Sequence, residues 1–119
     1  MSAITEEKED YILHKASGLY TYQDMDALIR YVNPVIEKDP NAKFLLDYSE
    51  MTNYEPKAMK MAYERIAEGF PKTVKIALFH KQKGFFNFIL NEISHSMIQN
   101  SKFFSDFEDA KKWLLEKSV

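Results

Sequence analysis

The sequence predicts a single small α/β domain in which a mostly parallel sheet is flanked by helices. Apolar segments typical of strands alternate with segments of helical periodicity, in the order βαβαβαβα. The connections between them are short, which favours right-handed crossovers between parallel strands. The length of 119 residues fits one domain, 1–119, with one core. Residues 1–9 are acidic and are expected to be less ordered than the rest.

The first half of the pattern begins with a strand over residues 11–17. Its direction relative to the other strands is left open by the sequence. Thr21 then has the character of a helix N-cap, with Asp24 three residues later completing a capping box. The helix extends to about Lys38, and Pro34 inside it is expected to kink it or end it early.

A short apolar run over residues 43–48 is typical of a buried strand. A loop follows, and then a helix that begins near Pro56, since proline suits the first helical turn. Gly69 and Pro71 end this helix. Residues 74–79 form the clearest strand of the chain.

The last third predicts a helix over 85–99 and a short strand over 101–105. Asp106 is expected to cap the final helix, with Asp109 at its third position. Trp113 lies on the apolar side of this helix and is expected to be largely buried. These elements complete the predicted sheet with its covering helices.

The composition excludes several classes of site. There is no cysteine, and the three glycines are too few for a glycine-rich phosphate loop. The three histidines lack metal-binding spacing, so neither a metal nor a cofactor is expected. The acidic N-terminus does not resemble a signal peptide, and no apolar run is long enough to span a bilayer, so a cytoplasmic location is expected.

Charge is unevenly distributed along the chain. The formal net charge is −2, but residues 57–83 carry seven basic and two acidic side chains, a local charge of +5. Such a stretch could attract an acidic partner or an anionic surface. A solvated helix surface is the favoured explanation, and no specific nucleic-acid partner is expected.

Polar side chains follow the two central strands of the predicted sheet: Asp47, Ser49, His80, Lys81 and Lys83. Because parallel strands end at one edge, these side chains form a candidate ligand site, and the lysines beside a helix start suit an anion. Alternatively, Asp47 and Ser49 form hydrogen bonds with the loop backbone, and the lysines are solvated. No catalytic residue is assigned, since the serine lacks the G-x-S-x-G context of a nucleophile.

The helix predicted over 85–99 is apolar over more than one face. Phe85 and Phe88 lie beside its core stripe, and Ile98 widens it further. These three residues predict an interface, most simply that of a homodimer. The alternative is that the rings pack under a neighbouring loop.

Four strings, taken in their order and spacing, resemble the SpoIIAA-like branch of the STAS superfamily. SGLYTYQD resembles the opening of that family's first helix, and LLDYSEMTNYEPKA resembles its second strand with the start of the next helix. VKIALF resembles the third strand, and KFFSDFEDAKKWL resembles the closing helix. The similarity spans residues 11–116.

The resemblance implies a STAS-like fold, related to anti-sigma factor antagonists and, more remotely, to SEC14-type lipid carriers. The antagonists switch by phosphorylation of a serine that opens the helix after the second strand. The corresponding string here is EPKA, beginning at Glu55, with no Ser or Thr at the switch position. Neither the phosphorylation switch nor its kinase therefore carries over.

Three functions follow as hypotheses. The first is a non-enzymatic protein-interaction or regulatory module that binds a protein partner or a second copy of itself. The second is a binder of a small lipophilic ligand or of a membrane surface. The third and weakest is a hydrolase that uses Ser49, His80 and Asp47.

Overall fold

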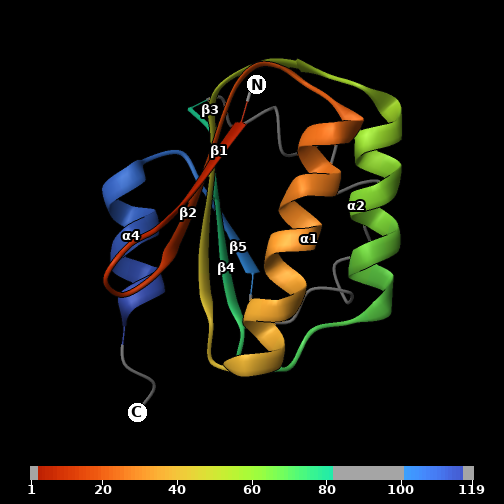
Figure 1. Cartoon of the computed structure of the whole chain (residues 1–119). Coiled ribbons are helices and arrows are strands. Elements are labelled where there is room, and N and C mark those ends of the chain that lie inside the picture. Colours follow the sequence, from red (N-terminus) through yellow and green to blue (C-terminus); the bar gives the residue numbers. More distant parts are fainter. Residues whose placement is uncertain (1–2, 82–100, 117–119) are drawn as a thin grey trace.

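The computed structural model describes residues 3–81 and 101–116 (Figure 1). In this part of the chain, an initial hairpin is followed by helices and strands that alternate up to residue 79, and a strand and a helix make up the second described range. The elements are β1 (Ala3–Glu7), β2 (Ile12–Tyr20), α1 (Tyr22–Lys38), β3 (Lys43–Tyr54), α2 (Pro56–Glu68), β4 (Lys75–Phe79), β5 (Ser101–Phe104) and α4 (Phe107–Leu115). The predicted helix over 85–99 lies outside the described residues.

The five described strands form one sheet in the order β1-β2-β3-β4-β5. Strands β2 to β5 pair in parallel, and β1 pairs with β2 in the antiparallel direction. The expected mostly parallel sheet is therefore confirmed. The N-terminal segment differs from expectation, because Ala3–Glu7 forms a regular strand where residues 1–9 were predicted to be less ordered.

The helices cover both faces of the sheet. Figure 1 shows α1 and α2 side by side on one face, with α4 on the other. Residues from the two faces belong to separate apolar clusters: Tyr20 and Phe44 pack toward α1 and α2, whereas Leu45 on the other face clusters with Leu114 of α4. Burial on both faces explains why the central strands are nearly continuous apolar runs.

Local rules account for the helix ends. Thr21 caps α1 through the predicted capping box with Asp24, and the Asp106 side chain accepts from the Asp109 amide at the start of α4. Helix α2 begins at Pro56 as expected. Pro34 does not shorten α1, which continues to Lys38.

Strand β3 is longer than the apolar run that predicts it. It continues through a polar stretch to Tyr54, pairing with the far end of β2. Register shifts between Lys15 and Ser17 and after Gly18, whose φ is +66°, let the two strands remain paired. Ser49 is therefore in a strand and not in a loop.

Trp113 differs from its predicted burial. It is only partly buried, lying against the Phe104 ring at a centroid distance of 5.7 Å. The Lys75 ammonium lies 4.4 Å from the centre of the indole and donates to the Trp113 carbonyl at 2.7 Å. The tryptophan thus closes the end of α4 against β4 and β5 with one side toward solvent.

Candidate functional site at the carboxyl edge of the sheet

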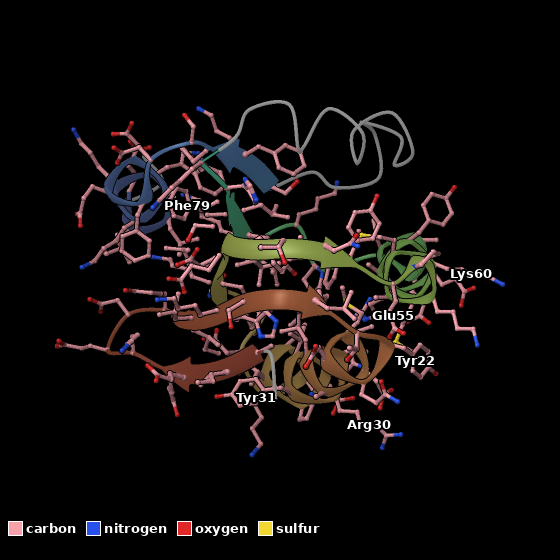
Figure 2. The ribbon with its side chains drawn as sticks, turned by 90° about the horizontal axis from the view of Figure 1, so that it is seen from above. Tyr22, Arg30, Tyr31, Glu55, Lys60 and Phe79 are labelled. Atoms are coloured by element: carbon pink, nitrogen blue, oxygen red, sulfur yellow. The ribbon has the colours of Figure 1, made fainter. Side chains whose placement is uncertain are left out.

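The carboxyl ends of β2 and β3 meet at the starts of α1 and α2. The backbone N–H of Glu55 donates to the carbonyl of Tyr20 at 2.9 Å, which ties the end of β3 to the end of β2. The Glu55 carboxylate then accepts from the backbone N–H of Tyr22, the first residue of α1, at 2.7 Å. Figure 2 shows Tyr22 and Glu55 next to each other at this end of the molecule.

Glu55 caps the neighbouring helix and not its own. It is the N-cap residue of α2, yet its side chain makes no capping bond to that helix. Instead its negative charge lies at the N-terminus of α1, where helix amides lack partners and the helix dipole favours an anion. One carboxylate therefore fixes the two helix starts relative to each other.

Apolar side chains are exposed around this junction. Leu19 is 46% exposed at the end of β2, and Tyr22 is 40% exposed at the start of α1. Both flank Tyr20, which is fully buried. We call Leu19, Tyr22 and Glu55, with Pro56 and Lys57 at the exposed start of α2, the carboxyl-edge surface.

A buried polar cluster lies beneath this surface. The His14 ring is 2% exposed and bonds the Tyr20 hydroxyl through Nε2 at 2.7 Å and the Thr5 hydroxyl through Nδ1 at 2.8 Å. Either neutral tautomer satisfies both contacts, with donor and acceptor exchanged. The rings of His14, Tyr20 and Tyr48 meet edge to face, with centroids 5.4 to 6.2 Å apart.

Burial determines the protonation of this cluster. It lowers the pKa of His14 from its ordinary 6.5 to about 4, against the opposing attraction of Asp24. It also raises the pKa of Tyr48 to about 12 and, together with the neighbouring Tyr48, raises the pKa of Tyr20. At neutral pH the imidazole is uncharged and both phenols keep their protons, so the cluster is a structural hydrogen-bonded unit.

The predicted ligand residues are only partly brought together. Asp47 lies in β3 directly beside Phe79, and the buried His80 follows Phe79. The Asp47 carboxylate accepts a hydrogen bond from the backbone N–H of Ser49 at 2.9 Å. This is the kind of backbone contact that the sequence analysis gave as the alternative to a ligand site. Lys81 is exposed.

Lys83, Phe85, Phe88 and Ile98 lie outside the described residues. The proposed nucleophile Ser49 lies in extended strand, without the sharp turn that presents a catalytic serine. Within residues 3–81 and 101–116, no group of side chains could hold a metal ion, and no helix is long and apolar enough to cross a membrane.

Sequence reasoning missed Leu19, Tyr22 and Glu55 as candidates. The helix start itself was recognised, but the contact of Glu55 with Tyr22 joins residues 33 positions apart. The sequence did contain a signal that His14 is buried. The alternation of β2 places it on the same side as Ile12 and Ala16, and all three residues are buried.

Comparison with solved structures places the fold. An uncharacterised protein of the DUF3478 family from Shewanella loihica, described as having a SpoIIAA-like fold, is 20% identical, with a TM-score of 0.63 over 94% of this chain and 91% of that one. The anti-sigma factor antagonist SpoIIAA in its unphosphorylated form is 6% identical, with a TM-score of 0.68 over 92% of this chain and 94% of that one. At such identities the likeness shows the fold alone.

No protein among the curated sequences matches this chain. The SpoIIAA-like family model, in contrast, matches residues 12–115, nearly the whole described sheet and its helices. The family resemblance seen in the sequence is thereby confirmed, and the chain belongs to the SpoIIAA-like family.

Proposed function

We propose that this chain is a non-enzymatic regulatory module that acts by binding a protein partner at the carboxyl-edge surface. The fold it shares with an anti-sigma factor antagonist supports the general class. The observation that carries the proposal is the exposure of Tyr22 at the start of α1, where its backbone N–H bonds the Glu55 carboxylate at the start of α2, together with the exposure of Leu19 at the end of β2. Large apolar side chains that are exposed in a contiguous patch are typical of interaction sites.

The starting residues of α2 support binding without phosphorylation. The string EPKA from Glu55 offers no hydroxyl group at the helix start, and Ala58 is fully buried. The negative charge at this point is supplied permanently by Glu55 and is already used to cap α1. We therefore expect a surface whose charge and shape are constant, so that regulation acts on the amount or state of the partner.

The chemistry of the surface indicates the kind of contact. Leu19 and Tyr22 supply apolar and aromatic area, and aromatic side chains often dominate the binding energy of an interface. Lys57, at the exposed start of α2, adds a positive charge at the rim. A partner would therefore present an apolar patch that buries the tyrosine.

The test begins with a photo-crosslinking amino acid at position 19, used in cells to identify the partner by mass spectrometry. With the purified partner, Tyr22→Ala is expected to weaken binding at least tenfold by calorimetry. Tyr63→Ala is the matched control, because Tyr63 is also 40% exposed but lies two turns along α2. Equal effects of the two substitutions would contradict the proposed surface.

The test also separates the alternative classes. Native mass spectrometry of protein purified from cells is expected to show the bare chain or a protein complex. Retention of a lipid at stoichiometric amount would contradict the proposal and favour the lipophilic-ligand hypothesis. Hydrolysis of a general ester substrate that is lost in Ser49→Ala would favour the enzyme hypothesis.

A further inference from the structure

The outer edge of β1 is a second feature, formed by other residues than the carboxyl-edge surface. Within the described residues, β1 pairs with β2 on one side and has no strand on the other. An edge strand of this kind presents a row of backbone groups that can pair with another chain. Figure 2 shows β1 at one edge of the sheet, with β5 at the other.

The register identifies the outward backbone groups. The amide of Lys8 donates to the carbonyl of Tyr11 at 2.8 Å, so these residues form a hydrogen-bonded pair at the end of the hairpin. Inward and outward groups alternate along an antiparallel strand. The alternation directs the N–H groups of Thr5 and Glu7 away from β2.

The side chains of β1 are arranged unusually for an edge strand. The polar Thr5 points inward, where its hydroxyl bonds His14, and Ile4 on the other face is 61% exposed. Ile4 is the most exposed large apolar side chain in the described part of the chain. The register requires position 4 to face outward, but it does not require an isoleucine there.

Charge restricts what can pair with this edge. The end of β1 and its turn expose four carboxylates against one lysine, a net charge of −3: Glu6, Glu7, Lys8, Glu9 and Asp10. The lysine is already paired with Glu6 at 2.9 Å. A second copy of β1 would bring the same negative charge, whereas a basic segment would complement it.

We propose that the outer edge of β1 binds an extended basic segment of a partner protein as an added strand. The outward amides of Thr5 and Glu7 supply the main-chain bonds, Ile4 packs against an apolar side chain of the segment, and the carboxylates select lysine or arginine. This site uses other residues than the carboxyl-edge surface and adds to the proposed function. Without a partner, the same charges keep the edge from pairing indiscriminately.

The test uses a fluorescent peptide of seven residues that alternates lysine and valine, with a glutamate–valine peptide as the control. Binding to the whole chain is measured by anisotropy at low salt. Glu7→Pro removes one outward amide without removing a bond to β2, and Glu7→Gln removes the same charge but keeps the amide. We expect the proline variant to bind at least fivefold more weakly than the glutamine variant.

Equal binding by the two variants would overturn the proposal and reduce the effect to charge attraction. Hydrogen exchange provides a second measurement on the unmodified chain, in which the amides of Thr5 and Glu7 should exchange at least tenfold more slowly with the lysine peptide. Unchanged exchange would also overturn it. Sedimentation should show no wild-type dimer that the Glu7→Pro substitution dissociates. Such a dimer would show that the outer edge of β1 binds a second copy of the chain and not a basic segment.

Discussion

Protonation of His14 should make the protein sensitive to mild acid. The imidazole is buried and neutral, and its pKa is lowered from 6.5 to about 4. Between these two values the unfolded chain binds a proton at this site and the folded chain does not. Stability that is complete above pH 6.5 is therefore lost as the pH falls toward 4, by about 1.4 kcal/mol for each pH unit.

The comparison with a variant isolates this contribution, because other titrating groups are shared. His14→Gln keeps one donor and one acceptor but cannot take up the proton. It should be less stable than the wild type at pH 7.5, because its shorter amide fills the site less well. Between pH 7.5 and pH 4.5 the wild type should lose about 2.5 kcal/mol more than the variant.

Urea unfolding followed by circular dichroism at four pH values measures both quantities. Thr5→Val is the control, since it removes a hydroxyl bonded to His14 while leaving the imidazole in place. It should lower stability at every pH and keep the wild-type loss in acid. Parallel pH profiles for wild type and His14→Gln would refute the reasoning, as would an NMR titration of His14 centred near 6.5.

Two further predictions concern the helix ends. Thr21→Ala removes the capping box of α1 and should lower the free energy of unfolding in urea by about 1 kcal/mol. Thr21→Ser keeps the hydroxyl and should leave this free energy nearly unchanged. Equal losses for the two variants would show that the hydroxyl is not the cause. Trp113→Ala should cost about 2–3 kcal/mol, below the usual range for a fully buried tryptophan, because the ring is only partly buried. A loss above about 4 kcal/mol would show that the ring is buried more completely than this structure has it.

Features set by neighbours in sequence were predictable. Thr21 and Asp24 form a capping box because they are three residues apart, and Pro56 suits a first turn wherever the helix packs. The alternation that joins His14 to Ile12 and Ala16 was likewise readable from the strand alone. Each of these depends on contacts within about one helical turn or a few strand residues, where the physics is local.

Features that depend on pairing between distant segments of the chain were not predictable from the sequence. The stretch after Asp47 is polar and resembles a loop, but β2 pairs with it as far as Tyr54, so β3 doubles its predicted extent. The capping role of the Glu55 carboxylate could not be predicted from the sequence, because this carboxylate caps α1 and not the helix that Glu55 itself begins. The interface predicted from Phe85 and Phe88 stays a prediction, since both lie outside the described residues.

The register of β1 shows how one buried hydrogen bond can outweigh apolar burial. A slip by one residue that brings Glu6 opposite His14 would turn Ile4 and Glu6 inward and Thr5 outward. Burying Ile4 would contribute about 2 kcal/mol. The slip would also leave Nδ1 of His14 without the Thr5 hydroxyl, at about 1–3 kcal/mol, and bury the Glu6 carboxylate at a greater cost. The polar terms therefore fix the strand, and the exposure of Ile4 follows from them, while its apolar character needs another cause.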